Sequence, residues 1–520
     1  MSADASPNFS SVKCGVLFSF LILFYLFSSC YYPAPGGDEV IYSVTAHGLT
    51  LGRGFSRYAM PGPHHYEVFD HFPPIIHVLM AASYKVFGFG IWQTKFPSWI
   101  AASSAGALIF ILVKRLTKKG WLAEKALAIF SLNSLVGNAF VSGRFESLYM
   151  VFMMLALFAA FVGAGASVAK KVPTLWLISG IATGLAIVSY YSYAPLSVAI
   201  LLTLSFLLPR DPVHSRSLRR SAMIFSFLGL AMVCALFYAL HLSHRVDLFQ
   251  LQIGGQLDTY AGKSIGDLIA SIRSEPRRYG AFMFRWLGFA DLIFLIGAIG
   301  LMLRCGQKTA RCMAVCCLLW LAFLAVYGTK GPQSLSPVYL FAIIGFSISW
   351  DESTSQKKVI DRLASKMICG GVICFGLLRV ALIAFTILWQ WEARNYSDVE
   401  AQIHAHVPSS AKIAAPQTAW YALAGRVSRI HLYCQDFSRI GVQNGAASLN
   451  DPAYLKDFSH VILASTAIQQ PGLEPFVKMT RSNYVLVYQR KKPFKKLPWT
   501  SEDPYFMEIY ERKISSKEPS

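Results

Sequence analysis

The stretch that decides the fold is Gly36–Ile76, which reads GGDEVIYSVTAHGLTLGRGFSRYAMPGPHHYEVFDHFPPII. It begins just after the first long apolar run and ends where the sequence becomes apolar again. It holds an Asp-Glu pair, two arginines, four histidines, six aromatic residues and four prolines. Most of the remaining sequence is hydrophobic, so a polar stretch of this composition indicates a functional site.

The composition of the whole chain indicates a membrane protein. Of its 520 residues, 54% are hydrophobic and 15% are charged, whereas a soluble globular protein has about 25% charged residues. Apolar runs recur from residue 14 to residue 389, and each has roughly the 20 residues that cross a bilayer as a helix. A membrane β-barrel would instead show short segments of alternating polarity. The sequence therefore predicts an all-α, multi-pass membrane protein.

The basic residues predict the orientation of the chain rather than a nucleic-acid partner. The formal net charge is +20, but the Lys and Arg residues lie mostly in short loops between apolar runs, as the positive-inside rule describes. No basic stripe alternates with aromatic residues, so we expect no nucleic acid to bind. The ten cysteines lie mostly in or beside apolar runs, where packing is their usual role, and they predict no disulfide framework.

Charge also sets the topology. With the N-terminus inside, about eleven spans place every basic cluster on one side of the membrane and the C-terminus on the other. A further apolar segment, residues 75–87, has about 13 residues, too few to cross, and is predicted to be an interfacial helix on the outer surface. Residues 38–51 are predicted to form a short amphipathic helix. The predicted spans are 14–32, 98–116, 122–141, 147–166, 174–190, 193–209, 221–241, 281–303, 312–328, 337–350 and 367–389.

The sequence predicts three regions. Residues 1–390 form the membrane catalytic domain, with a first outer loop at 33–97. From Trp391 the sequence becomes less apolar, and residues 391–490 are predicted to form a small α/β domain outside the membrane, with strands near 406–415, 458–464 and 484–488. Residues 491–520 are predicted to be a tail.

Three polar features fall on the predicted outer face. Asp38-Glu39 begins the first outer loop, Gly143–Glu146 fills the second outer turn, and Lys330–Tyr339 lies at a later one. A partly desolvated carboxylate at such a surface can act as a general base toward a hydroxyl group. Arg and Lys can neutralise a leaving phosphate. This combination favours transfer of a group from a lipid phosphate.

Each feature also has a structural explanation when it is taken alone. Asp38 could cap the helix that follows it. Arg144 and Glu146 could be solvated turn residues, and Lys330 could be an interfacial lysine whose charge reaches the membrane surface. The histidines match no tight metal-ligand spacing, so no metal site is predicted among them: His64, His65, His71 and His77. The residues alone therefore predict a multi-pass protein with an outer polar site.

The order of short motifs carries the analysis further. The first loop and the helix after it contain, in sequence, Gly37-Asp38-Glu39, Gly52-Arg53-Gly54, Pro61-Gly62, Tyr66, Phe72-Pro73-Pro74-Ile75 and Phe87-Gly88. This order resembles the protein mannosyltransferase and aminoarabinose transferase superfamily, membrane glycosyltransferases of the GT-C type. Three later segments also resemble parts of this superfamily. Ser142–Ser147 looks like the second acidic motif of the superfamily, Ala182–Pro195 is similar to its middle helix pair, and Lys330–Tyr339 is similar to its late outer loop. The resemblance covers roughly residues 14–350.

The resemblance implies an activity and a set of site residues. The activity is inverting transfer of a hexose or pentose from a polyprenyl-phosphate donor to an acceptor on the non-cytoplasmic face. The implied catalytic residues are Asp38, Glu39 and Glu146. The implied donor-phosphate contacts are Arg144, Lys330, His71 and Arg57. Many relatives carry a lysine where this chain has Phe72, so either the neighbouring His71 takes over its charge or the contact with the donor differs. The implied substrate contacts are Tyr66 and Tyr339.

The expected partners follow from this activity. They are the membrane, a polyprenyl-phosphate sugar and an acceptor that is a lipid, a glycan or a protein; the only cofactor considered is a divalent cation. We expect a bacterial inner membrane, with the site on the periplasmic face. The alternative is a transporter or flippase for lipid-linked glycan precursors. Such proteins tend to carry charges within their spans and internal repeats, whereas these spans are expected to be nearly free of charge.

Overall fold

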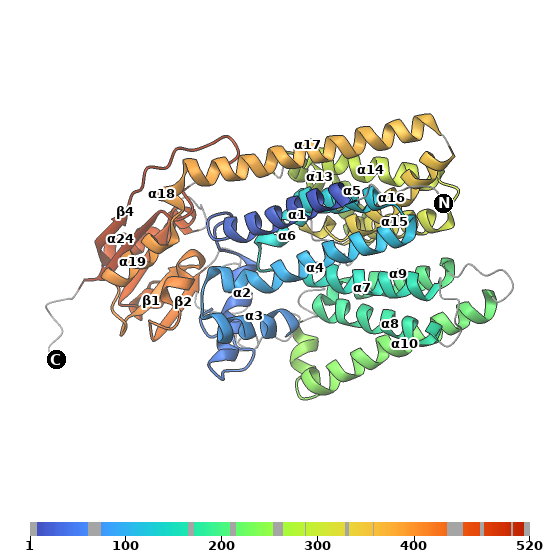
Figure 1. The fold of residues 1–520 in the computed structure, drawn as a ribbon. Coiled ribbons are helices and arrows are strands. Elements are labelled where there is room, and N and C mark those ends of the chain that lie inside the picture. Colours follow the sequence, from blue (N-terminus) through green and yellow to red (C-terminus); the bar gives the residue numbers. More distant parts are fainter. Residues whose placement is uncertain are drawn as a thin grey trace. The chain divides into compact units, whose positions relative to one another are not determined.

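In the computed structural model, the described part of the chain forms two compact units, drawn in Figure 1. The first unit comprises residues 1–26, 70–76 and 97–381, and the second comprises 27–69, 77–96 and 382–520. The described residues are 8–60, 74–164, 171–208, 215–252, 264–285, 288–327, 332–356, 358–433, 451–468, 473–500 and 503–513.

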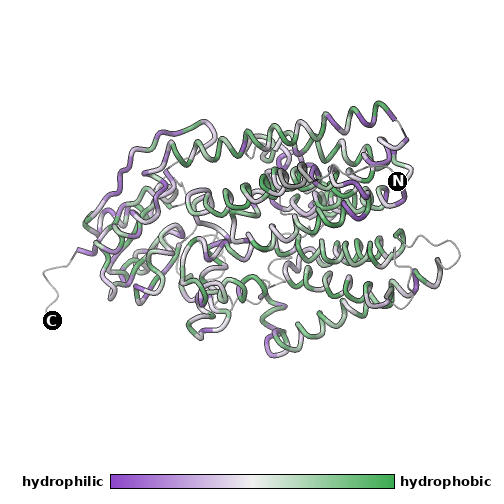
Figure 2. The backbone as a smooth tube through the Cα atoms, in the orientation of Figure 1, coloured by the Kyte–Doolittle hydropathy of each residue, from purple (hydrophilic) through white to green (hydrophobic). Residues whose placement is uncertain are grey.

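The first unit is a helical bundle. Hydrophobic residues follow most of the length of its helices (Figure 2), as expected where lipid or other helices surround each helix. Short 3-10 or π segments are η2 (Tyr191–Tyr193), η3 (Tyr238–Leu242) and η4 (Pro332–Leu335). The α-helices, some shared with the second unit, are α1 (Asn8–Ser28), α4 (Ile91–Thr117), α5 (Gly120–Leu132), α6 (Ser134–Val141), α7 (Glu146–Ala164), α8 (Lys171–Ser189), α9 (Ala194–Leu207), α10 (Ser215–Phe237), α12 (Ile265–Arg273), α13 (Glu275–Arg285), α14 (Phe289–Arg304), α15 (Lys308–Val326), α16 (Val338–Ser355) and α17 (Val359–Trp389).

Glycines allow the closest helix packing in the bundle. Helix α8 lies between α7 and α10 (Figure 1). A Cβ atom added at Gly180 of α8 would collide with the carbonyl oxygen of Ser226, and one at Gly229 of α10 would collide with that of Leu177. Small residues at such crossings let two backbones approach and gain van der Waals contact, the principal attraction between helices in lipid.

The helices agree with the predicted spans. Seven helices of the described chain are long and apolar enough to cross a membrane, and three shorter apolar helices accompany them. Nine of the eleven predicted spans fall on one of these ten helices, whereas the span predicted at 281–303 begins in α13 and ends in α14. The number of crossings itself stays a prediction. The span predicted at 122–141 is two helices, because Asn133 has an extended backbone (φ −61°, ψ 135°) and its side chain caps α6 by accepting from the N–H groups of Leu135 and Val136.

The second unit contains a five-stranded sheet with strand order β2-β1-β3-β5-β4. Strands β2, β1 and β3 are parallel, and β5 runs antiparallel to both of its neighbours. The strands are β1 (Lys412–Pro416), β2 (Arg429–Tyr433), β3 (His460–Ala464), β4 (Tyr484–Arg490) and β5 (Met507–Arg512). The accompanying helices are α2 (Asp38–Thr50), most of α3 (Pro74–Phe87), α18 (Trp391–Arg394), α19 (Tyr396–His406), η5 (Gln417–Ala419), α20 (Trp420–Leu423), α22 (Pro452–Lys456), α23 (Ser465–Ile468) and α24 (Glu474–Asn483).

The sheet confirms the predicted strands and corrects the predicted tail. The expected strands near 406–415, 458–464 and 484–488 are β1, β3 and β4. Residues 507–512, expected in a tail, form β5 and pair along its length with β3 and β4. Met507 and Ile509 are buried in the sheet, so this strand completes the core after a Lys-rich connection.

The first outer loop shares a hydrophobic core with this sheet. Val40 and Val44 of α2 belong to the same buried cluster as Ile413 of β1. Two hydrogen bonds join the same parts: Trp420 Nε1 donates to Ser43 Oγ at 2.9 Å, and the N–H of Leu432 donates to the carbonyl of Ala59 at 2.7 Å. The part of the loop that contains α2 and Ala59, expected within the membrane domain, thus packs on the C-terminal domain.

Candidate active site

Asp38 begins helix α2 in the second unit. The N-cap residue is Gly37, whose φ of 56° favours glycine, and its N–H donates to Gln417 Oε1 at 2.8 Å. Asp38 is therefore the first residue of the helix rather than its N-cap, so the capping role considered for it does not apply. Its half-buried carboxylate lies at the end of the helix where the macrodipole stabilises negative charge.

Glu39 is paired with Lys95, a residue that was not predicted from the sequence to belong to the site. Lys95 of α4 is fully buried, and its Nζ lies 3.7 Å from Glu39 Oε2. The same ammonium donates to the carbonyl oxygens of Ser29 at 2.7 Å and Pro33 at 3.3 Å. The Tyr421 hydroxyl lies 3.5 Å from Glu39 Oε1. Lys95 lies in the predicted first outer loop, between the apolar segments 75–87 and 98–116, so composition alone gave no signal that it would be buried.

A chain of buried hydrogen bonds supports the inner face of α2. The Ser43 hydroxyl, besides accepting from Trp420, lies 2.8 Å from that of Tyr84, which lies 2.7 Å from that of Thr94. Burial raises the pKa of Tyr84, so its hydroxyl stays protonated and available as a donor. Fully satisfied buried networks of this kind rigidify their surroundings, and this one holds the helix that presents Asp38.

Other polar residues in the described part of the first loop are also held in place. His47 Nδ1 lies 2.6 Å from the Tyr58 hydroxyl, and the Arg53 guanidinium lies 4.5 Å from the centre of the Tyr58 ring. Burial is the first cause of a lowered pKa at His47. Arg57, expected to contact the donor phosphate, is 4% exposed and its Nη2 lies 3.9 Å from Met60 Sδ.

The second acidic motif lies in the first unit. Arg144 and Glu146 form an ion pair, with Nη2 to Oε1 at 2.8 Å and Nε to both carboxylate oxygens at 3.1 Å. Glu146 is the first residue of α7 and is 4% exposed. Ser98 Oγ donates to the Arg144 carbonyl at 2.8 Å. A buried carboxylate held by arginine is not a solvated turn residue, so that structural alternative does not apply to Glu146.

The other implied residues are placed as follows. Tyr339, an implied substrate contact, is completely buried near the start of α16, with its ring centre 6.2 Å from that of Phe294. Lys330, His71 and Tyr66 lie outside the described residues. Asp38, Glu39 and Arg57 thus belong to one unit, and Arg144, Glu146 and Tyr339 to the other.

A buried polar network in the bundle contradicts the expectation that the spans are nearly free of charge. Arg379 of α17 donates to the Tyr25 hydroxyl at 2.8 Å and to the Asn133 carbonyl at 3.2 Å. Asp291 of α14 accepts from the N–H of Ser134 at 2.8 Å and from its hydroxyl. The network gathers at the break between α5 and α6, where backbone groups left free by the interruption need partners.

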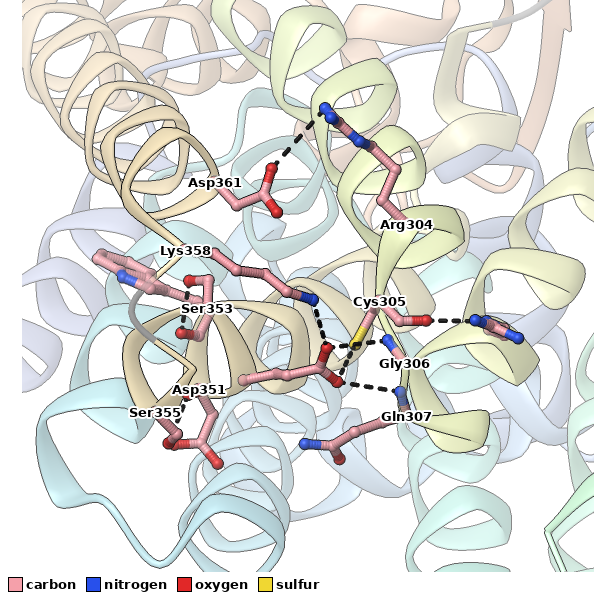
Figure 3. Close-up of polar contacts among 12 residues, drawn as sticks. Arg304, Cys305, Gly306, Gln307, Asp351, Ser353, Ser355, Lys358 and Asp361 are labelled. Atoms are coloured by element: carbon pink, nitrogen blue, oxygen red, sulfur yellow. Dashed lines mark hydrogen bonds and ion pairs between the residues drawn. The ribbon is translucent and has the colours of Figure 1, made fainter.

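A second polar cluster joins helix ends that carry basic residues (Figure 3). The Glu352 carboxylate accepts from the N–H groups of Gly306 at 2.9 Å and Gln307 at 3.0 Å, and from Lys358 Nζ at 3.0 Å. Arg304 pairs with Asp361 at 3.7 Å, and Lys119 pairs with Asp351 at 2.6 Å. These contacts tie the α14–α15 loop to α16 and α17, which is a structural role.

No group of three metal-ligating side chains occurs among the residues that the structure describes. The divalent cation considered from the sequence stays a prediction.

Comparisons with known proteins agree with this architecture. Residues 71–241, about a third of the chain, match the family model described as dolichyl-phosphate-mannose-protein mannosyltransferase. No curated protein sequence matches the chain. A solved structure of ArnT from Cupriavidus metallidurans bound to undecaprenyl phosphate superimposes with a TM-score of 0.60 at 11% identity, covering 97% of this chain and 99% of that one.

Two further structures have the same fold. The apo structure of the same ArnT gives a TM-score of 0.59 at 11% identity, covering 96% of this chain and 98% of that one. The arabinofuranosyltransferase AftD from Mycobacteria gives 0.53 at 11% identity, covering 96% of this chain but 40% of that larger protein. The helical bundle with its C-terminal sheet is thus similar in fold to the glycosyltransferases ArnT and AftD, and residues 71–241 resemble the mannosyltransferase family model.

Proposed function

We propose that this protein is an inverting glycosyltransferase that moves a hexose or pentose from a polyprenyl-phosphate donor to an acceptor on the non-cytoplasmic face of the membrane. The observation that carries the proposal is the position of Asp38 in a GT-C fold: a half-buried carboxylate at the start of α2, beside the Glu39–Lys95 pair. The similar ArnT structure, which holds undecaprenyl phosphate, supports a lipid-phosphate donor.

The proposed chemistry uses Asp38 as the general base. The acceptor hydroxyl transfers its proton to Asp38 while its oxygen attacks the anomeric carbon, and the bond from that carbon to the phosphate oxygen breaks on the opposite face. The leaving polyprenyl phosphate gains negative charge, which Arg144, Lys330, His71 or Arg57 would neutralise. Glu39 would fix the start of α2, and Glu146 would orient Arg144. Tyr66 and Tyr339 remain proposed substrate contacts.

The test uses the purified full chain in a bilayer. Its substrate is a lipid-linked sugar whose lipid part carries a radiolabel, and the assay measures the release of labelled polyprenyl phosphate. Asp38→Asn should lower turnover by about 10²–10⁴-fold, the usual contribution of a general base, with unchanged thermal unfolding. Glu400→Gln is the matched control, because Glu400 is an exposed carboxylate of the same unit. Near-normal turnover in Asp38→Asn would reject the assignment.

The competing proposal is a transporter or flippase of lipid-linked precursors. It is favoured by one observation, the charged side chains of Asp291 and Arg379 at a broken helix, because intramembrane charges and discontinuous helices often line transport pathways. Vesicles with a fluorescent lipid-linked sugar distinguish the two. A flippase would move the intact lipid between leaflets without releasing polyprenyl phosphate, whereas a transferase would release it.

The inner membrane of a bacterium, with the site on the periplasmic face, is the proposed location.

A further inference from the structure

A pocket of about 470 Å³ lies between α5, α16 and α17, within the first unit. Its aromatic wall is formed by Trp121 of α5 and Trp350 of α16, whose rings meet edge to face at 5.2 Å. Three cations surround it: Lys125 of α5 and Arg362 and Lys366 of α17. Lys125 Nζ lies 6.0 Å from the centre of the Trp350 ring. The lining residues include no carboxylate.

The positive charge of this pocket is not compensated within the described chain. Lys119 is paired with Asp351. Arg304 is paired with Asp361 and Lys358 with Glu352 (Figure 3). Among the residues that the structure describes, by contrast, Lys125, Arg362 and Lys366 form no ion pair. The acidic groups of this end of the bundle are thus already engaged, and the pocket keeps a formal charge of +3.

The surroundings of the pocket suit a lipid. Beyond the cations, α17 presents apolar side chains outward, including Leu363 at 57% and Met367 at 69% exposure. Gly370, which lines the pocket, has no atom within 4 Å of the position a Cβ would take. Tryptophans at the level of the headgroups are typical of membrane interfaces. A charged headgroup could therefore meet the cations while its acyl chains follow α17.

We propose that this pocket binds the phosphate headgroup of an anionic membrane phospholipid. Basic pockets between helices on the cytoplasmic side recognise such headgroups, and Arg362 can bind phosphate oxygens bidentately. The pocket lies at the end of α16 opposite Tyr339, separated from it by most of an 18-residue helix. The site is therefore distinct from the proposed donor site, and the inference does not rest on the proposed catalytic activity.

The test is lipid binding by the purified full chain, measured by native mass spectrometry while phosphatidylglycerol or phosphatidylcholine is titrated. The triple variant Lys125→Gln, Arg362→Gln, Lys366→Gln should bind phosphatidylglycerol at least about tenfold more weakly, with phosphatidylcholine binding unchanged. The matched control is Lys114→Gln, Arg115→Gln, Lys308→Gln, which removes the same charge from exposed residues of the bundle outside the pocket. It should change binding less than about twofold.

Three outcomes would overturn the proposal. Equal losses in the two triple variants would mean that the charge acts without a specific pocket. Unchanged phosphatidylglycerol binding in the pocket variant would exclude the site. Saturation by inorganic phosphate alone, with no preference between the two lipids, would make free phosphate the ligand. Thermal unfolding of both triple variants establishes that each is folded. A third variant, Trp121→Phe, keeps all three cations and should weaken phosphatidylglycerol binding less than the pocket triple variant does.

Discussion

The Nζ atom of Lys95 lies 3.7 Å from Oε2 of Glu39, and both side chains are buried. This pair joins the start of α2 to α4, and the two carbonyl bonds of Lys95 extend the connection to residues 29 and 33. A buried ion pair costs desolvation energy, and here it fixes the residue that follows Asp38. This geometry supports the positioning role proposed for Glu39.

The first prediction tests whether Lys95 and Glu39 stabilise the fold as a pair. Lys95→Met leaves Glu39 buried without its cation, so the free energy of unfolding should fall by about 3–5 kcal/mol. The double variant Lys95→Met, Glu39→Gln should recover part of that loss, because neither charge remains. Denaturant or thermal unfolding measures both. A double variant as unstable as the sum of the single variants would show that the two residues do not interact.

The second prediction concerns Arg144. Arg144→Lys keeps a positive charge beside Glu146 but cannot form the bidentate pair, so turnover should fall about tenfold while stability changes by about 1 kcal/mol. Arg144→Ala should be more destabilising, because it leaves Glu146 buried without its partner. Polyprenyl-phosphate release and thermal unfolding are measured on both variants. Full activity in Arg144→Lys would show that a point charge suffices.

Much of this architecture could be predicted because it depends on local patterns. Apolar runs of about 20 residues mark helices wherever they occur, and nine of the eleven predicted spans each fall on a single apolar helix. The turn before Glu146 follows from a polar interruption between two such runs. The strands β1, β3 and β4 are short segments rich in apolar residues, which is typical of strands.

The missed features depend on contacts between distant segments. Arg379 and Asp291 are each one polar residue in a long apolar run, and only the fold shows that they meet at the Asn133 break. Lys95 and Glu39 are 56 positions apart, and their pairing required α4 to pass beside α2. Strand β5 follows a Lys-rich segment that resembles a tail in composition, and its pairing partners lie upstream in the chain.

The third prediction concerns pH. Burial is the main cause of a lowered pKa at His47, His431 and His460, all in the second unit. Because the ordinary pKa of histidine is about 6.5, the unfolded chain takes up protons first as the pH falls. The free energy of unfolding should therefore decrease as the pH falls from about 7 to about 5.5. Replacing the three histidines with glutamine should flatten this dependence. A stability that rises as the pH falls through this window would contradict the prediction.

The fourth prediction tests helix packing. Gly180→Ala places a methyl group against the carbonyl of Ser226, so the variant should lose about 1–3 kcal/mol of stability through overpacking. Gly300 of α14 is the matched control, because nothing lies within 4 Å of its added Cβ. Gly300→Ala should be neutral or stabilising by up to about 1 kcal/mol. Equal effects of the two substitutions would exclude close packing of α8 on α10.

The fifth prediction addresses the polar network at the α5–α6 break. Arg379→Met removes a charged donor to the Tyr25 hydroxyl and to the Asn133 carbonyl, which still accepts from the Gly137 N–H. Hydrogen bonds to charged groups contribute about 1.5–3 kcal/mol, so stability should fall by about that amount. Asp291→Asn keeps an oxygen that can accept from Ser134, so its stability loss should be smaller. If the network only satisfies the interrupted backbone, polyprenyl-phosphate release by folded Arg379→Met should persist near the wild-type rate. Loss of lipid movement between leaflets in that variant, with the fold retained, would instead favour the flippase, because the network would then act on the transported lipid.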